Sequence, residues 1–326
     1  MKYAFIERHQ RVWPISVECR GPQRQVFVAG VQCRGPQRQV FVAGVECRVL
    51  RVSASGYHQH LARRLDISQR RHLNDQALLV HISAVYAESR GAYGWPRIAR
   101  GLVRRGIRVS KRRVQRLMQK HGIQARGKRR FRIATTDSKH NLPIAPNLLN
   151  RNFIAAAPNQ AWVGDFTYIP TEEGWLFLAI VIDLFSRKVV GWSMRPEMHR
   201  NLVIDALDMA WLGRNPGKQT GLIFHSDRGS QYASEDFAKV LERCSITPSM
   251  SRKGNRWDNA CSETVFGSLK VERLHGRRFQ TIREAKDETI SRLLWYNRTR
   301  MHSTLNYASP MQFEQNWTDA KAKIAA

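Results

Sequence analysis

The sequence predicts an α/β protein: a mixed five-stranded sheet flanked by helices, preceded by a small all-helical domain. Three observations support this fold class. Between residues 160 and 250, runs rich in Val, Ile, Trp and Phe alternate with helical patterns, as expected for strands joined by turns and helices. Between residues 57 and 125, apolar residues recur at helical spacing instead. At 326 residues, the chain is long enough for two or three domains, each with its own core.

Changes in composition divide the chain into five expected segments. These are an N-terminal segment at 1–56, a helical domain at 57–125, a basic extended linker at 126–158, an α/β core at 159–276 and a helical extension at 277–326. The first contains a tandem duplication at 17–44, whose second copy differs from the first only by Gln32 in place of Glu18. Because solenoid repeats are longer and need at least three units to bury a core, we expect this segment to be poorly ordered.

Positive charge is concentrated in the first half of the chain. The formal net charge is +28; residues 1–150 hold 30 Lys/Arg against 7 Asp/Glu, whereas residues 151–326 hold 24 against 19. Such an excess implies a polyanionic partner, DNA or RNA, bound mainly by the N-terminal half. The longest apolar run, at 175–182, is too short to cross a membrane, and no signal peptide is recognisable. We expect a cytoplasmic, nucleoid-associated protein without a membrane partner.

A helix-turn-helix is predicted within the helical domain. A helical pattern beginning at Pro96 is broken by Gly106, and Ser110 suits the N-cap of a second helix at 111–121, with Gly122 after its end. The alternative is an ordinary solvated helical hairpin. DNA contact is favoured because basic residues follow one edge of the second helix and continue past its end. They are Arg112, Arg113, Arg116, Lys120, Arg126, Lys128, Arg129 and Arg130.

The α/β core is expected to contain three strands, then a helix, a strand, a helix, a strand and two long helices. The strands are expected at 161–169, 175–184, 188–194, 222–226 and 246–250, and the helices at 201–212, 234–244, 258–274 and 282–300. This order is that of a ribonuclease-H-like sheet. Ahead of the core, residues 57–90 are expected to form a helix, and residues 141–158, with three prolines, an extended linker.

Three carboxylates stand where this fold can bring them together. Asp165 falls within the first strand, Asp227 at the end of the fourth and Glu263 early in the following helix. Three such acids can hold two Mg²⁺ ions, with Mn²⁺ as a substitute, because Mg²⁺ prefers hard oxygen ligands. A pair of ions roughly 4 Å apart activates one oxygen of an in-line phosphoryl displacement and stabilises the other. The nucleophile is then a water molecule or a DNA 3′-OH.

The helix that carries Glu263 is predicted to have one polar and one apolar face. At 100° per residue, its polar face is made of Asn259, Glu263, Gly267, Lys270 and Leu274. Its apolar face is made of Cys261, Val265 and Leu269. Lys270, two turns beyond Glu263, is expected to contact a phosphate beside the metal ions.

Each acid taken alone has a simpler interpretation, because aspartates at strand ends are common turn residues and helical glutamates are commonly solvated. The three local motifs together favour catalysis. Asp183, inside an apolar run, competes as a ligand, although residues 184–187 favour a turn. His225, beside Asp227, either orients a water molecule or makes a structural hydrogen bond, and the structural role is favoured.

These motifs closely resemble those of bacterial insertion-sequence transposases with a retroviral-integrase-type catalytic domain. More narrowly, the chain resembles the downstream-frame product, OrfB, of elements with two overlapping reading frames. The resemblance runs from about residue 45 to residue 313. It includes Tyr93-Gly94, Trp162-Val163-Gly164-Asp165, Asp183-Leu184-Phe185-Ser186-Arg187, His225-Ser226-Asp227-Arg228-Gly229, Trp257-Asp258-Asn259, Phe266-Gly267-Ser268-Leu269-Lys270 and Tyr296-Asn297.

The resemblance implies a DDE site in which Asp165, Asp227 and Glu263 bind two metal ions and Lys270 contacts the terminal DNA of the element. It also implies cleavage that exposes a 3′-OH, followed by strand transfer without a covalent enzyme intermediate. The implied partners are the terminal inverted repeats, target DNA, the upstream-frame product OrfA (as a frameshift fusion) and further copies of the chain in a homo-oligomer. The chain departs from the family pattern in two ways that bear on whether this copy is active. Cys261 stands where the family commonly has Pro, and the duplication at 17–44 is absent from the pattern.

Two other functions compete with transposition. One is a catalytically inactive remnant or regulator that binds element ends, which metal-dependent nicking or joining of such DNA would distinguish. The other is a nuclease of RNA–DNA hybrids with a similar fold, for which the basic helix-turn-helix has no evident task.

Overall fold

The computed structural model describes residues 53–65, 73–127, 141–217, 220–252, 256–274 and 277–325. The duplication at 17–44 and three basic residues predicted to bind DNA, Lys128, Arg129 and Arg130, lie outside these ranges. The chain forms two compact units, Met1–Leu78 and Leu79–Ala326. Among the described residues, no helix has both the length and the apolar character needed to cross a membrane.

The prediction of a single helix at 57–90 is wrong. Two helices are present instead, α3 (Ala54–Leu65) and α4 (Asp75–Glu88). Asn74 lies outside both, and its side-chain oxygen accepts a hydrogen bond of 2.7 Å from the backbone N–H of Ala77. This is an N-cap, which starts a new helix and therefore interrupts the expected one.

The predicted helix-turn-helix pair is present as α5 (Trp95–Arg104) and α6 (Lys111–Lys120). The Ser110 hydroxyl caps α6 by accepting from the backbone N–H of Arg113 at 3.3 Å. Gly106 and Gly122 follow the two helices with φ of +76° and +63°, a left-handed conformation that glycine adopts without strain. The two helices are held together by buried Ile98, Leu102, Val114, Leu117 and Met118.

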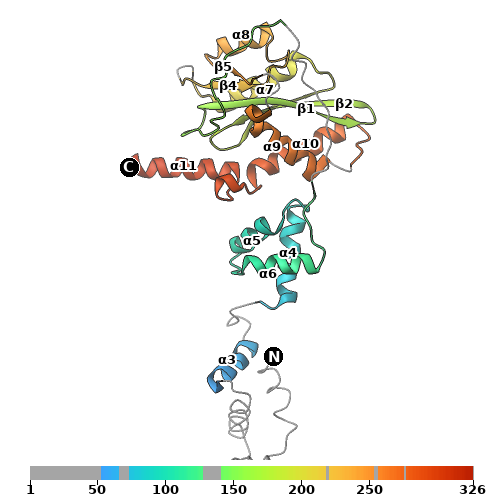
Figure 1. The fold of residues 1–326 in the computed structure, drawn as a ribbon, viewed down its shortest axis with the longest axis vertical. Helices are drawn as coiled ribbons and strands as arrows, with labels where there is room; N and C mark the ends of the chain where they lie inside the picture. The colour runs from blue at the N-terminus through green and yellow to red at the C-terminus, as the bar shows by residue number, and fades with distance from the viewer. Residues whose placement is uncertain are drawn as a thin grey trace, which may run out of the picture. The chain divides into compact units, whose positions relative to one another are not determined.

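A mixed five-stranded sheet forms the core of the second unit, as predicted (Figure 1). Its strands are β1 (Ala161–Thr171), β2 (Gly174–Asp183), β3 (Val189–Arg195), β4 (Ile223–Ser226) and β5 (Thr247–Met250). They lie in the order β3-β2-β1-β4-β5. The first three are antiparallel neighbours, and β4 and β5 extend the sheet in parallel with β1. This is the ribonuclease-H-like arrangement.

Helices cover both faces of the sheet (Figure 1). On one face, α7 (Arg200–Arg214) and α8 (Glu235–Arg243) close a core that includes Trp162, Phe166 and Phe237. On the other, α9 (Ala260–Leu269) and α10 (Ile282–Arg298) pack Val265 and Leu293 against the strands. The alternating apolar residues of β1 and β2 therefore serve two separate cores, which fixes the register of the sheet.

The expected helix at 258–274 is divided into three parts. A 3-10 turn (Arg256–Asn259) precedes α9, and a π-helical turn (Lys270–Leu274) follows it. Val265 and Leu269 are buried and Glu263 is exposed, as predicted, but Asn259 is buried, against expectation. The ideal helical projection fails for Asn259 because the preceding turn is not α-helical.

The predicted extended linker lacks regular structure in its described part, 141–158, but it is packed against the sheet. Leu149 is buried, the backbone N–H of Leu148 donates to the Ser249 hydroxyl at 2.9 Å, and that of Met250 donates to the Pro146 carbonyl at 3.3 Å. The segment therefore covers the outer edge of β5, which would otherwise present unpaired backbone groups.

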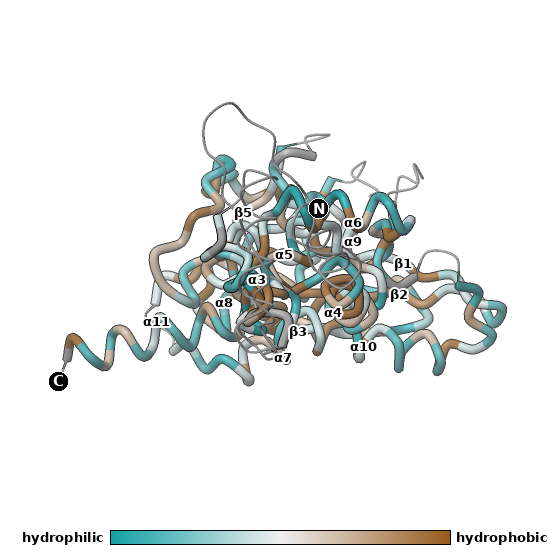
Figure 2. The backbone as a smooth tube through the Cα atoms, turned by 90° about the horizontal axis from the view of Figure 1, so that it is seen from below, coloured by the Kyte–Doolittle hydropathy of each residue, from teal (hydrophilic) through white to brown (hydrophobic). Residues whose placement is uncertain are grey.

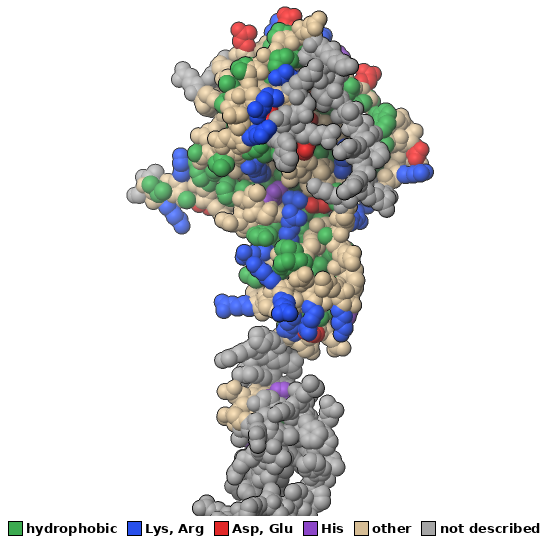
Figure 3. Space-filling model, in the orientation of Figure 1, with side chains coloured by type: hydrophobic (Ala, Val, Ile, Leu, Met, Phe, Trp, Pro, Cys, Tyr) green, Lys and Arg blue, Asp and Glu red, His purple; other side chains and the backbone are tan. Residues whose placement is uncertain are grey.

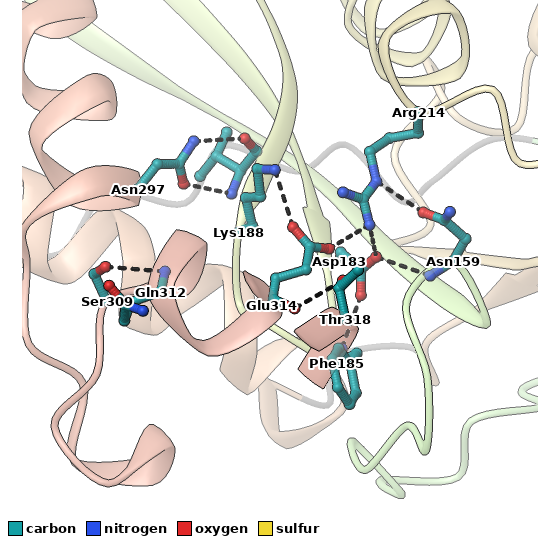
Figure 4. A network of polar contacts seen from close by, with 11 residues as sticks. Asn159, Asp183, Phe185, Lys188, Arg214, Asn297, Ser309, Gln312, Glu314 and Thr318 are labelled. Carbon is teal, nitrogen blue, oxygen red and sulfur yellow. Dashed lines mark hydrogen bonds and ion pairs between the residues drawn. The ribbon is translucent and has the colours of Figure 1, made fainter. Parts of the chain in front are cut away.

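The C-terminal helix α11 (Pro310–Ala325) extends away from the sheet with alternating hydrophilic and hydrophobic residues (Figure 2). Glu314 holds its first half in place by ion pairs with Arg214 and Lys188 (Figure 4). Arg214 also donates to Asp183 at 3.1 Å, and the backbone N–H of Phe185 donates to the same carboxylate at 2.9 Å. Asp183 therefore organises the turn after β2, as the residues following it predicted.

The contact between β3 and α7 depends on Gly191. A Cβ at this position would lie 2.1 Å from the Ala206 carbonyl oxygen and 2.8 Å from the Ala210 Cβ. We expect Gly191→Ala to lower the free energy of unfolding by about 1–3 kcal/mol or more, since α7 must move away from the sheet. Gly213→Ala is the control, because a Cβ there meets no atom within 4 Å and alanine favours a helix. Denaturant unfolding that shows equal stability for both variants would contradict this packing argument.

Candidate active site and DNA-binding surface

Asp165 and Asp227 lie at neighbouring positions on adjacent strands. β1 and β4 are parallel and pair from Ala161↔Ile223 to Val163↔His225, and two residues further along each chain stand the two aspartates. Partial burial and the charge of Asp227 raise the pKa of Asp165 to about 7. The two acids therefore lie close together, as predicted, and their negative charges repel one another.

Backbone and hydroxyl groups hold the two carboxylates in place. One oxygen of Asp165 accepts from the backbone N–H of Phe166 at 2.8 Å, and the Ser262 hydroxyl also contacts this carboxylate. One oxygen of Asp227 accepts from the backbone N–H of Gly229 at 3.0 Å. Tyr232 is buried nearby, and burial together with both aspartate charges raises its pKa well above 10. Neither Ser262 nor Tyr232 stood out in the sequence, because their role depends on contacts across the fold.

Glu263 lies on the exposed side of α9, and its charge further raises the pKa of Asp165. It is therefore near the aspartate pair. Within the described ranges, however, no three His, Cys, Asp or Glu side chains are gathered closely enough to ligate one metal ion.

Lys270 follows α9 and lies close to the same group of acids. It is half-buried, its Nζ lies 4.9 Å from the centroid of the Tyr168 ring, and the charge of Asp165 acts on it. Burial lowers the pKa of Lys270, and Asp165 partly offsets that effect. The four residues expected in the catalytic site, Asp165, Asp227, Glu263 and Lys270, therefore form one electrostatically coupled group.

A further acid, Asp258, anchors the start of the catalytic helix. Its side chain is fully buried and accepts hydrogen bonds from Asn147 at 3.0 Å, from Arg151 at 3.1 Å and from the guanidinium and backbone N–H of Arg252 at 3.0–3.1 Å. The Arg252 hydrogen bond holds the pKa of Asp258 well below its usual range. In the sequence, Asp258 stands five residues before Glu263, and nothing there indicates its distant partners Asn147 and Arg151.

His225 has a structural role in the described part of the fold. Its Nδ1 lies 2.8 Å from the Ser249 hydroxyl and its Nε2 lies 3.2 Å from the Asp258 carbonyl oxygen. The ring is fully buried, and burial lowers its pKa. It therefore links β4 to β5 and to the start of the catalytic helix, as the favoured interpretation predicted.

Glu272 anchors the other end of the catalytic helix. Its buried carboxylate pairs with Arg292 and, at 2.9 Å, with Arg300. Two buried arginines thus share one acid. Burial and the charge of Arg300 lower the pKa of neighbouring His302 to about 3, which keeps its ring neutral. Arg126, predicted to contact DNA, donates to the Glu272 carbonyl oxygen at 3.2 Å and so contacts this anchor.

The basic surface predicted for the helix-turn-helix is exposed. Arg112, Arg116 and Lys120 are exposed on α6, whereas Arg113 is half-buried. Figure 3 shows Lys and Arg side chains gathered over the helices of this region. Further exposed basic residues are Arg104, Arg105, Arg108 and Lys111. One of them, Arg105, forms an ion pair with Glu88. The exposed cations form a continuous surface suited to a phosphate backbone.

Family comparisons agree with this division of the chain. Two models described as "Integrase core domain" match residues 155–256 and 244–310, and one described as "HTH-like domain" matches residues 73–131. An integrase core on a ribonuclease-H-like sheet, preceded by a helix-turn-helix, defines the class: a DNA-binding polynucleotidyl transferase.

Sequence relatives narrow this class to one family. The chain is 39% identical over 317 residues to the Escherichia coli K12 protein "Transposase InsF for insertion sequence IS3A", covering 96% of this chain and 98% of that protein. It is 41% identical over 275 residues to an "Insertion element IS600 uncharacterized 31 kDa protein" of Shigella sonnei, covering 83% and 97%. The chain belongs to the family of IS3-type insertion-sequence transposases and is a DNA transposase.

Solved structures with a similar arrangement are retroviral integrases. The catalytic core of HTLV-2 integrase in complex with magnesium matches with 18% identity and a TM-score of 0.35, covering 49% of this chain and 98% of that one. A chain of the simian T-cell lymphotropic virus intasome in complex with a PP2A subunit matches with 14% identity and a TM-score of 0.40, covering 72% and 74%. The family assignment rests on the sequence relatives.

Asp258→Asn tests the anchor at the start of α9. We expect it to lower the free energy of unfolding at pH 7 by about 2 kcal/mol, because hydrogen bonds to a buried charge are lost. The deficit should shrink below about pH 4, since a carboxyl with a depressed pKa stabilises the fold only while it is ionised. Glu235→Gln is the control, because it also removes one negative charge but takes it from an exposed ion pair with Lys239. Equal unfolding midpoints for the two variants would rule out an anchoring role.

Asp165→Asn tests the charge conflict in the acid group. Because like charges raise the pKa of Asp165, removing its charge should stabilise the metal-free protein. We expect Tm at pH 8 to rise by about 2–4 °C, the change that 1 kcal/mol produces in a domain of this size. Asp208→Asn, which removes an aspartate paired with Arg243 on the surface, should not raise it. Thermal unfolding in EDTA measures both, and a fall in Tm for Asp165→Asn would contradict the repulsion.

Proposed function

We propose that Asp165, Asp227 and Glu263 hold two Mg²⁺ ions, which Mn²⁺ can replace, and that Lys270 contacts a phosphate of the element's terminal DNA. The observation that carries this proposal is the parallel pairing of β1 with β4, which sets Asp165 beside Asp227. Carboxylate oxygens are the ligands that Mg²⁺ prefers, and a divalent cation would offset their repulsion. These residues therefore fit a metal site by charge and by donor chemistry.

In this proposal the protein's residues have distinct tasks. Asp165 and Asp227 are fixed by backbone hydrogen bonds, whereas exposed Glu263 completes the ligand set. The Lys270 ammonium binds the DNA phosphate and orients the strand. Bound cations would supply Lewis-acid activation of the attacking and leaving oxygens. The proposed reactions are cleavage that exposes a 3′-OH and transfer of that end to target DNA, and neither uses a side-chain nucleophile.

The helical region is proposed to bind the terminal inverted repeats. Arg112, Arg113, Arg116 and Lys120 on or beside the exposed edge of α6 support this, and the proposed contact continues through Arg126 and residues 128–130. The proposed domains remain 57–125 for DNA binding, 126–158 as linker, 159–276 as catalytic core and 277–326 as extension. The proposed partners are DNA, the upstream-frame OrfA product as a frameshift fusion, and further copies of the chain, and the proposed location is the cytoplasm.

Metal-dependent nicking of element-end DNA tests the proposal. We expect Asp227→Asn to lower the nicking rate in Mg²⁺ at least about 100-fold, which corresponds to about 2.7 kcal/mol of transition-state stabilisation. Mg²⁺ and Mn²⁺ should raise the Tm of the unmodified protein, and this shift should be lost in Asp227→Asn. Asp208→Asn, a surface aspartate on α7, should retain both properties. DNA binding without nicking and without a metal-induced Tm shift would instead support a non-catalytic regulator.

A further inference from the structure

An aromatic pair lies beside Lys270 near the end of the β1–β2 hairpin. The rings of Tyr168 and Trp175 meet edge to face with centroids 4.9 Å apart, and the Lys270 Nζ lies 4.9 Å from the Tyr168 centroid. Trp175 is 49% exposed, which is unusual for so large an apolar side chain. A cation and two aromatic rings, one of them open to solvent, therefore form a continuous group.

The hairpin that presents these rings is held rigidly. The Thr171 hydroxyl donates to the Gly174 carbonyl across the turn at 2.8 Å, and Gly174 has a φ of +120°. The backbone N–H of Glu172 donates to the Phe279 carbonyl at 3.0 Å. The Glu173 carboxylate accepts from the backbone N–H of Ile282 at the start of α10, at 2.7 Å. Two contacts from the segment leading into α10 thus fix the turn, so Trp175 is presented at a set position.

Lys270 links the aromatic pair to the acid group. Tyr168 stands three residues after Asp165 on β1, and the charge of Asp165 acts on Lys270. β4 pairs with β1 only as far as Val163, so β1 and β2 extend beyond the short parallel strands (Figure 1). Lys270 reaches Tyr168 in this stretch. A DNA strand with a phosphate at Lys270 would therefore pass the aromatic rings.

Aromatic rings beside a cation suit one ligand chemistry in a DNA transposase. Every DNA base has a π-face that stacks on an aromatic side chain, and the adjacent cation binds the backbone phosphate. An apolar peptide would leave Lys270 unused. A purely structural pair would not require Trp175 to remain half-exposed on a braced turn.

We propose that the exposed Trp175 ring, braced edge to face by Tyr168, forms a stacking platform for an unpaired DNA base next to the phosphate bound by Lys270. This inference rests on the proposed function, in which Lys270 contacts DNA beside the acids. A platform at a fixed position would hold the base of a terminal nucleotide that has left the helical stack. The platform would contact the face of an unstacked base and leave its hydrogen-bonding edge uncontacted. It would therefore bind strand ends with little sequence preference.

Element-end DNA carrying 2-aminopurine at each position flanking the cleaved phosphate tests the platform. Stacking quenches 2-aminopurine, so the protein should quench it at one position. Trp175→Ala should restore its fluorescence and weaken binding of DNA with an unpaired terminal base about 5- to 150-fold. Trp175→Phe and Tyr168→Phe should retain quenching, because each keeps a ring. Leu212→Ala, which truncates an apolar side chain on α7 that is 78% exposed, is the matched control.

The outcomes separate this inference from the proposed function. Equal quenching by Trp175→Ala and the unmodified protein would overturn the platform, as would a loss that Trp175→Phe does not restore. If the unmodified protein quenches but does not nick in Mg²⁺, catalysis fails while the platform stands. If nicking proceeds without quenching at any position, the platform fails alone. Thermal unfolding of Trp175→Ala, expected within about 0.5 kcal/mol of the unmodified protein, excludes misfolding as the cause.

Discussion

The parallel pairing of β1 with β4 is the constraint on which the catalytic site depends. Hydrophobic cores on both faces of the sheet fix this register, and the register sets Asp165 beside Asp227. Burial and, after it, the charge of Asp227 raise the pKa of Asp165 to about 7, so the two carboxylates oppose one another. The free energy that the cores contribute therefore holds together charges that would separate in a more flexible chain. A site under such repulsion is suited to cations and ill suited to remaining empty of them.

The third acid, Glu263, lies near this pair on a helix that is anchored at both ends. Asp258 fixes the start of α9 through Arg252 and Arg151, and Glu272 fixes the turn beyond it through Arg292 and Arg300. Each anchor is an acid satisfied by arginines from other segments of the chain. Glu263 and Lys270 lie between the anchors and face the acid group. Breaking either anchor should therefore disturb catalysis without removing a catalytic side chain.

The basic surface that attracts DNA and the acids proposed for catalysis lie in different parts of the chain. Basic residues are exposed over α5 and α6, where positive charge attracts a phosphate backbone over a broad surface. Around the acids, the cationic group is Lys270 and the aromatic residues Tyr168 and Trp175 lie beyond it. Many exposed cations raise the affinity for DNA, whereas a few fixed groups set the position of the bound strand. Arg126 contacts the Glu272 anchor, which connects the end of the helical region to the catalytic helix.

The amino-acid pattern was enough to predict the order of strands and helices along the chain and the helix-turn-helix, because period-two and helical spacing, caps and local motifs depend on neighbouring residues. The closeness of Asp165 and Asp227 was also predicted. The pattern further predicted that Asp183 forms a turn and that His225 is structural. It failed for the helix expected at 57–90 and for buried Asn259, and it did not find the partners of Asp258 and Glu272. The partners lie in other segments of the chain, such as Arg292, 20 positions from Glu272, and Asn147, 111 positions from Asp258. The other two features depend on where one helix ends and the next begins. Contacts between distant residues leave no periodic signal in the sequence, so the tertiary structure decides which acids, such as Asp258 and Glu272, become anchors.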